Sequence, residues 1–482
     1  MSIQFVLLWS DALLFVLIAA IVALVLWARR QDALRAAWSR VAKDGVAMAA
    51  ATVLAAFILV GLLDSLHYRA LLPAQPGAAA RYAVEVNSAL DALLSDLRQR
   101  AEKTYSAPLA TRLYSKEALE NSTQREFPRL KHGGAHLGSD LSGQEFDIAI
   151  RVSRGCAGGL VVWLLLAAAW CRLRGVGVVE MLKVGAAPPC VPGIPVARRE
   201  AESRVCRDRG QVTEIRAVTL TLLPILLLLG IAISLGGGYH VFGTDKVGQD
   251  VLYLSLKSIR TGLLIGTLTT LVMLPLAVLL GILAGYVGGW VDDVIQYLYT
   301  TLSSIPGVLL IAAAVLMMQV IIDTHPEWFA TSAERADARL LALCLILGMT
   351  SWTGVARLLR GETLKLRELE FVQAAQAFGV GRFAIMRRHI LPNLMHIVLI
   401  SLVMDFSGLV LAEAVLSYVG VGVDPTTISF GTMINTARME LAREPMVWWS
   451  LAAAFSFMFA LVLAANLFAD AVRDAFDPRS SA

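Results

Sequence analysis

The chain has 482 residues, of which 57% are hydrophobic and only 17% are charged. This composition excludes an ordinary soluble protein of this length, and a net charge of +4 gives no indication of nucleic-acid binding. The five cysteines form no C-x-x-C pair, so we expect free thiols and neither disulfides nor a metal site. We expect no cofactor. His132 and His136 stand four residues apart, but the glycines between them argue against a helix, so we interpret them as loop histidines.

Nine apolar segments approach the roughly 20 residues that a membrane-crossing helix needs, which predicts an all-α polytopic membrane protein. The basic residues of the short loops place the N-terminus outside and the C-terminus inside the cell. Pro306 predicts a kink within the sixth span. The predicted spans are 5–27, 46–64, 157–171, 216–236, 260–286, 294–321, 338–358, 393–419 and 447–469.

The first half of the chain divides into three parts. Residues 1–64 hold two spans, and residues 65–155 form a polar segment that we place outside, because long loops are exempt from the charge rule. Residues 156–240 hold two further spans around a basic loop that we place in the cytoplasm. Within the polar segment, the apolar spacing of Arg81–Glu120 predicts a helix.

A polar and basic stretch between two apolar spans, residues 371–392, is predicted to form a helical hairpin. Its first half, Phe371–Phe378, has apolar and small residues at the i, i+3, i+4, i+7 spacing of one helix face. Gly379 then breaks the helix, because glycine adopts backbone angles that other residues avoid. A second short helix is expected before Pro392, which suits the first turn of the helix that enters the next span. Such a hairpin at a membrane surface is suited to docking a soluble partner.

This stretch resembles the EAA loop of ABC-importer permeases of the dipeptide, oligopeptide and nickel branch. Glutamine stands where the family commonly has glutamate. The matching residues are Gln373, Ala374, Ala375, Gly379, His389, Leu391 and Pro392. The stretch 243–250, GTDKVGQD, likewise resembles the family's G-T-D-x-x-G-R-D motif. The resemblance covers residues 240–478. It implies a type I ABC importer transmembrane domain over 258–470 and a cytoplasmic tail over 471–482, with extra N-terminal spans and an external polar segment.

The resemblance also implies a function. The chain would be a permease subunit in the bacterial inner membrane, forming the translocation path for peptides or similar small solutes. The implied partners are ATPase subunits docked on the EAA-like loop, a second permease subunit, an external substrate-binding protein and the lipid bilayer, with no nucleic acid. The sequence has no Walker A motif, so we assign ATP hydrolysis to the partners and do not expect an enzyme.

Two ionisable residues, Asp405 and Glu413, lie in the predicted span 393–419. Ionisable side chains within a membrane are costly and usually face a cavity or a neighbouring helix. Both are candidates for the translocation path, where they would meet a peptide amino terminus, but an interhelical hydrogen bond that fixes packing also explains them. The same pair leaves an alternative function open, an ion-coupled secondary transporter. Such proteins commonly show internal repeats, and we find none in this sequence.

Overall fold

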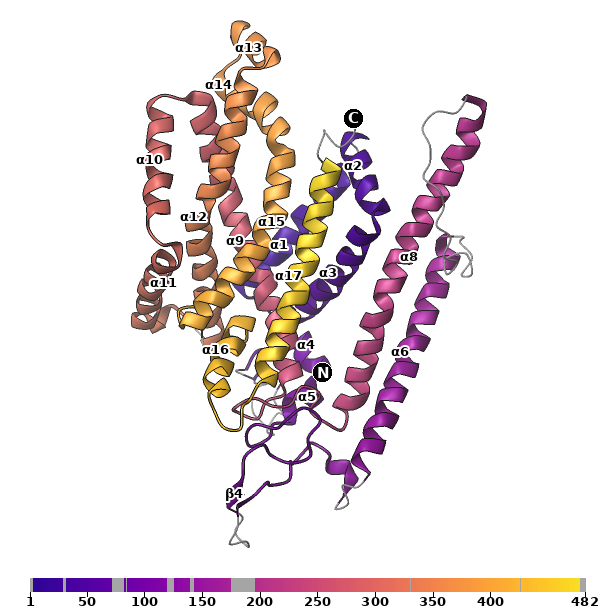
Figure 1. The fold of residues 1–482 in the computed structure, drawn as a ribbon. Coiled ribbons are helices and arrows are strands. Elements are labelled where there is room, and N and C mark those ends of the chain that lie inside the picture. The colour runs from indigo at the N-terminus through magenta and orange to yellow at the C-terminus, as the bar shows by residue number, and fades with distance from the viewer. Residues whose placement is uncertain are drawn as a thin grey trace, which may run out of the picture.

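The computed structural model describes residues 3–28, 32–71, 82–83, 85–118, 125–138, 143–174, 196–329, 331–424 and 426–476. Long helices dominate this structure and run in roughly the same direction through one bundle (Figure 1). Eight of the described helices are long and apolar enough to cross a membrane, and a shorter apolar run covers Trp9–Ala23. The prediction of an all-helical polytopic membrane protein is therefore confirmed.

The described part of the first half of the chain contains five helices of 12 or more residues and a small mixed segment between the third and fourth of them. The long helices are α1 (Trp9–Ala28), α2 (Asp32–Lys43), α3 (Gly45–Asp64), α6 (Gln144–Arg174) and α8 (Val196–Gly236). We call residues 65–143 the insert. Its short elements are β2 (His67–Ala70), β3 (Asn87–Ser88), α4 (Ala89–Leu93), α5 (Ser95–Gln99), β4 (Glu117–Ala118), β5 (Arg125–Glu126) and η1 (Ala135–Leu137). The first strand, β1 (Ile3–Val6), pairs antiparallel with β2, which pairs with β3 in turn.

The second half of the chain forms the rest of the bundle. Its elements up to the predicted hairpin are α9 (Val251–Val287), α10 (Trp290–Ser304), α11 (Gly307–Thr324), η2 (Pro326–Trp328) and α12 (Ser332–Arg367). They are followed by α13 (Glu370–Ala377), α14 (Arg382–Ile385), η3 (Met386–Ile390), α15 (Leu391–Val419), α16 (Phe430–Leu441) and α17 (Trp449–Phe476). Helix α9 has a central position, since it packs along α12 and also contacts α3, α15 and α17.

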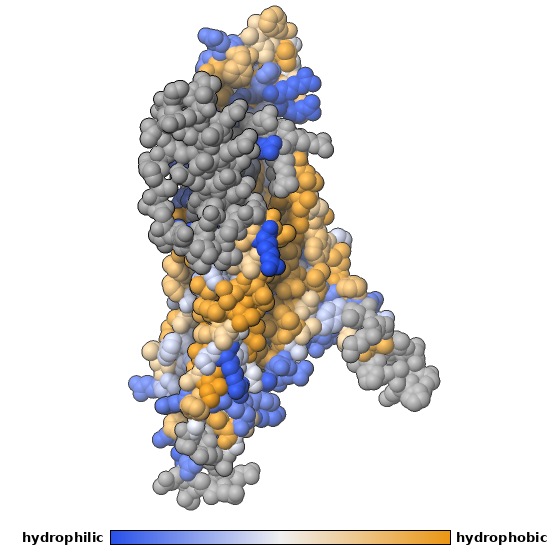
Figure 2. Space-filling model, turned by 90° about the vertical axis from the view of Figure 1, so that its right-hand side faces the viewer, coloured by the Kyte–Doolittle hydropathy of each residue, from blue (hydrophilic) through white to orange (hydrophobic). Residues whose placement is uncertain are grey.

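The two ends of the bundle carry different structures. Helix α13 projects from the end at the top of Figure 1, which we call the hairpin end, while the insert and α16 lie at the opposite, insert end. Figure 2 shows a broad apolar band between two more polar ends, the pattern that a surface embedded in lipid requires. Which end faces the cytoplasm stays a prediction.

The predicted span 294–321 is wrong as a single helix. The structure breaks it at Pro306 into α10 and α11, of which only α11 is long and apolar enough to cross a membrane. Ile305, the residue before the proline, has extended backbone angles of φ −91° and ψ 133°. Proline lacks an N–H and disfavours helical angles in the residue before it, so both effects end α10 at this point.

The helix predicted over Arg81–Glu120 is also wrong. The described part of that range contains only two five-residue helices, α4 and α5, and no longer helix. Ser88 begins α4 with a capping box, in which its hydroxyl accepts from the Asp91 backbone and the Asp91 carboxylate accepts from the Ser88 backbone. The leucines that suggested one long amphipathic helix belong to these short pieces, which pack at the insert end of the bundle.

Candidate functional site

The predicted hairpin is present, with one correction. Helix α13 begins at Glu370 and ends at Ala377, and Gly379 follows with φ of +77°, in the left-handed region that favours glycine. The second helix of the hairpin is not a separate element. Residues 382–419 form one continuous helical run, which passes from α14 through the π-helical turn η3 into α15. The hairpin is therefore a short helix joined by a glycine turn to the end of a membrane-crossing helix.

One side of the hairpin is buried against the bundle. Val372, Ile385 and Ile390 are fully buried, and Ala375 is nearly so. These residues pack against the ends of α9 and α12 in a single apolar cluster. Phe378, on the apolar face that the spacing predicts, is 87% exposed. Together with the 71% exposed Phe383, it places two large apolar side chains on the surface of this end of the bundle.

Polar contacts tie the hairpin and its surroundings to the bundle. The Gln376 side chain donates a hydrogen bond of 3.2 Å to the Tyr286 hydroxyl near the end of α9. Arg360 of α12 holds Asp292 of α10 through two hydrogen bonds of 2.6 Å, a bidentate geometry that fixes both helices in direction as well as distance. These hydrogen bonds join the hairpin to α9, and α10 to α12.

The remaining residues of the EAA-like pattern lie along the same stretch. Ala374 and Gln373 are exposed on α13, and the Gln373 amide donates to the Glu368 carbonyl at 3.2 Å. The His389 ring lies 6.2 Å from the ring of Phe371, across the hairpin. Leu391 packs against the apolar cluster of the hairpin, and Pro392 occupies the first turn of α15, as its missing N–H predicts.

The structure does not bring Asp405 and Glu413 together. Eight residues of helix separate them by about 12 Å along the axis of α15. Glu413 is buried, and its Oε1 accepts hydrogen bonds from Ser417 at 2.7 Å and from Ser429, the N-cap of α16, at 2.9 Å. It therefore fixes α15 to the start of α16. Asp405 is half-buried, and its Oδ2 has no hydrogen-bond partner among the described residues.

At the insert end, the GTDKVGQD stretch joins the insert to the bundle. The Thr244 hydroxyl donates to the Thr104 carbonyl at 2.9 Å and accepts from the Ser106 amide at 2.7 Å. Gly248 has φ of +81°, and a Cβ there would lie 1.9 Å from the Glu102 carbonyl oxygen, so only glycine permits this backbone contact. The motif thus has a structural role in this chain, because the insert packs on it.

A buried ionic cluster strengthens this junction. His240 Nδ1 lies 2.8 Å from Asp250 Oδ2, and its Nε2 lies 3.5 Å from Glu102 Oε1. The Glu102 carboxylate also accepts the backbone amides of residues 131–133 at 2.7 to 3.1 Å. Burial favours the neutral form of Glu102, but the nearby His240 and the hydrogen bonds from these amides lower the pKa of Glu102 to about 2. Burial would likewise lower the pKa of His240, yet Asp250 and Glu102 raise it to about 9.

This cluster is expected to make attachment of the insert depend on pH. Because the pKa of His240 rises from 6.5 to about 9, its contribution is complete below pH 6.5 and is lost as pH rises through 9. The contribution is on the order of 3 kcal/mol, while that of Glu102 is lost only in strong acid. We expect protease sensitivity of the insert to rise between about pH 7 and 10. His240→Gln should be more sensitive at pH 7 and change little thereafter.

The control for this experiment is His132→Gln. Burial lowers the pKa of His132, so its ring stays neutral over this range and the variant should keep the wild-type profile. If the protease sensitivity of the wild type and of His240→Gln changed with pH in the same way, His240 would not be the group that makes attachment of the insert depend on pH.

Sequence reasoning missed two features of these sites. Glu102 pairs with His240, which lies 138 positions away in the sequence, and no local sequence pattern predicts this contact. The exposure of Phe378 and Phe383, at 87% and 71%, was hidden because helical spacing alone does not say which face is covered. The signal that was available lies in the glycines of the GTDKVGQD stretch, which indicate a close backbone approach.

The chain is similar to known proteins over its second half. The sequence model of the family described as "Binding-protein-dependent transport system inner membrane component" matches residues 277–482. The oligopeptide transport system permease protein OppC of Mycobacterium tuberculosis is 31% identical over 244 residues, which are 51% of this chain and 77% of that protein. The dipeptide transport system permease protein DppC of Lactococcus lactis subsp. cremoris is 31% identical over 242 residues, 50% of this chain and 64% of that protein. The glutathione transport system permease protein GsiD of Pectobacterium atrosepticum is 31% identical over 242 residues, 50% of this chain and 73% of that protein.

Proposed function

Because this chain belongs to the family of binding-protein-dependent transport system inner membrane components, which are multi-pass inner-membrane proteins, we propose that it is the permease subunit of an ABC importer for peptides. The observation that carries the proposal is the hairpin, whose exposed Phe378 and Phe383 stand on a base packed into the ends of α9 and α12. The names of its relatives support peptides as the solute class.

In this proposal the hairpin end faces the cytoplasm and receives an ATPase subunit. Phe378 and Phe383 are the apolar anchors of the contact, and the exposed Arg387 and Arg388 carry positive charge beside them. Closure of the ATPases on ATP would move the hairpin, and the buried contacts of Val372 and Ile385 would pass the movement to α9 and α12. A second permease subunit completes the translocation path, and an external binding protein delivers the solute at the insert end.

Asp405 is the residue of α15 that we place in the translocation path. Its Oδ2 is buried and has no hydrogen-bond partner among the described residues, and in this proposal a peptide amino terminus or a group of the second permease subunit supplies one. Glu413 is assigned to packing, because its carboxylate is held by two serine hydroxyls. This arrangement disfavours the alternative of an ion-coupled secondary transporter, which would use both carboxylates as free binding groups.

The test is to purify the chain from its native membrane and to reconstitute the complex that accompanies it in vesicles. We expect an ATPase subunit and a second permease to co-purify, and we expect peptide uptake that requires ATP and the external binding protein. Uptake by the purified chain alone, driven by a proton or sodium gradient and insensitive to ATP, would overturn the proposal and favour the secondary transporter.

A further inference from the structure

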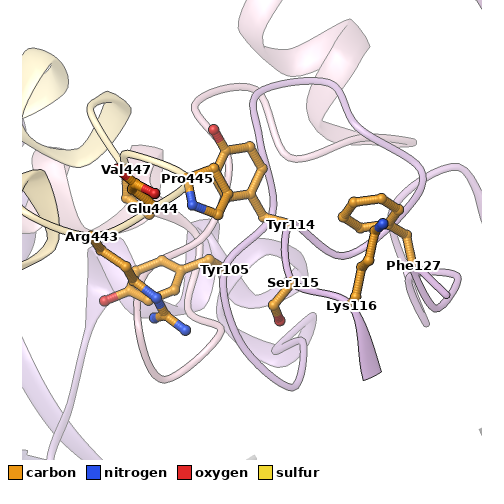
Figure 3. Close-up of a pocket in the computed structure, with 9 residues that line it drawn as sticks. All are labelled: Tyr105, Tyr114, Ser115, Lys116, Phe127, Arg443, Glu444, Pro445 and Val447. Atoms are coloured by element: carbon orange, nitrogen blue, oxygen red, sulfur yellow. The ribbon is translucent and has the colours of Figure 1, made fainter. Parts of the chain in front are cut away.

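A cavity of about 280 Å³ opens at the insert end, at the junction between the insert and the loop from α16 to α17 (Figure 3). We call it the junction cavity. Its apolar lining consists of the rings of Tyr105, Tyr114 and Phe127 from the insert, with Pro445 and Val447 from the loop. The volume is near the lower end of the roughly 300–1,000 Å³ of small-molecule sites, so it suits a ligand of dipeptide size and not a long chain.

The walls of the junction cavity are fixed by contacts outside it. Tyr114 packs edge-on against Trp449, with ring centroids 4.8 Å apart, and its hydroxyl donates to the Met446 carbonyl at 3.2 Å. Tyr105 is almost fully buried, and the Arg443 guanidinium lies 5.7 Å from its ring centroid. Both tyrosines are therefore positioned before any ligand arrives, which lowers the entropic cost of binding.

Two charged groups of the cavity lining lack an ionic partner among the described residues. The Lys116 ammonium lies 5.4 Å from the Phe127 ring centroid and forms no ion pair with a described carboxylate. Glu444, on the loop, likewise forms no ion pair with a described cation. The third charged lining residue, Arg443, is already paired with Glu440 at 3.3 Å. Figure 3 shows Lys116 and Glu444 on opposite sides of the cavity, with the tyrosine rings between them.

A cation and an anion without ionic partners in the described part of the chain, with an aromatic surface between them, are complementary to a zwitterion with an apolar middle. We propose that the junction cavity binds a short peptide with free termini. Lys116 binds its terminal carboxylate, Glu444 binds its terminal ammonium, and the rings contact an apolar side chain. This inference rests on the proposed function and adds to it a peptide site on the permease itself, outside the membrane-crossing helices.

The experiment measures binding of the labelled dipeptide alanyl-phenylalanine to the full chain in lipid nanodiscs, without ATPase or binding protein. Its N-acetylated and C-amidated forms serve as probes that each lack one terminal charge. We expect either cap to weaken binding about tenfold, the effect of losing one charged hydrogen bond. Lys116→Met should weaken binding of the free dipeptide about tenfold, and this variant should bind the amidated and the free dipeptide equally well. Glu444→Gln should weaken binding to the same extent and should bind the acetylated and the free dipeptide equally well.

The control is Lys103→Met, which removes a lysine of the insert that is paired with Glu117 at 2.7 Å and lies outside the cavity lining. This variant should bind the dipeptide as the wild type does. Absence of binding, or affinity that neither the caps nor the two cavity variants change, would overturn the site. Cavity variants that bind the dipeptide normally, but whose ATP-driven uptake is no longer stimulated by the external binding protein, would also overturn the site. The cavity would then be a docking surface for that protein. ATP-driven uptake measured in parallel keeps the two proposals apart, because it reports on the proposed function whether or not this site exists.

Discussion

Replacing Gly285 with leucine is expected to force α9 away from α12 and to destabilise the chain by about 3 kcal/mol, the upper range for overpacking. A Cβ at position 285 would lie 2.8 Å from the Arg360 carbonyl oxygen and 2.6 Å from Thr363 Cβ. Gly281, one turn earlier, makes the same kind of approach, 2.8 Å from the Ala356 carbonyl oxygen. Because the obstacles include backbone atoms, the larger residue cannot be accommodated by a rotamer change, and the helices must separate.

The measurement is thermal unfolding of the isolated chain in detergent, followed by size-exclusion chromatography. Gly354→Leu is the matched control, since it places the same side chain on α12 where a Cβ would meet open space. Gly285→Leu should melt at a markedly lower temperature and elute as aggregate, while the control should resemble the wild type. Equal melting temperatures for the two variants would show that the close approach of α9 and α12 contributes nothing to stability.

A local pattern indicates this contact. Gly281 and Gly285 stand four residues apart in an apolar segment, a spacing typical of closely packed membrane helices, and the structure places both against α12. Gly379 was likewise expected to break the hairpin, and it has the positive φ that this requires. In both cases the signal lies within a few residues of the chain, although α12, which Gly281 and Gly285 contact, lies far along the sequence.

The differences from the prediction have two kinds of cause, one local to the segment and one that depends on parts of the chain distant in sequence. The hydrophobicity of 294–321 is continuous, yet Pro306 divides it, because a missing donor and a steric restriction outweigh apolar length. The spacing in Phe371–Phe378 predicted a helix correctly but not its buried side. Val372 faces the ends of α9 and α12, and Phe378 does not. That choice is made by tertiary packing, which a single segment cannot reveal.

Removing both phenylalanines from the hairpin, as Phe378→Ala with Phe383→Ala, is expected to weaken binding of the ATPase subunit at least about 30-fold. Aromatic anchors at the centre of an interface commonly cost 2 kcal/mol or more when truncated, which corresponds to that factor. Transport and solute-stimulated ATP hydrolysis should fall together. Ala375→Glu is a less informative variant, because Ala375 is 9% exposed and a charge there would disrupt the packing of the hairpin itself.

The control pair is Phe455→Ala with Phe459→Ala, which removes two stacked and exposed phenylalanines from the middle of α17. It deletes the same number of atoms from the apolar band and should leave ATPase binding unchanged. The measurement is affinity for the purified ATPase subunit, with uptake by the reconstituted complex as the second readout. If the hairpin variant keeps full affinity and full uptake while remaining folded, its exposed aromatic surface is not the joint with the ATPase. The movement that drives transport would then have to enter the bundle elsewhere, and the proposal of an ABC permease would lose the observation on which it rests.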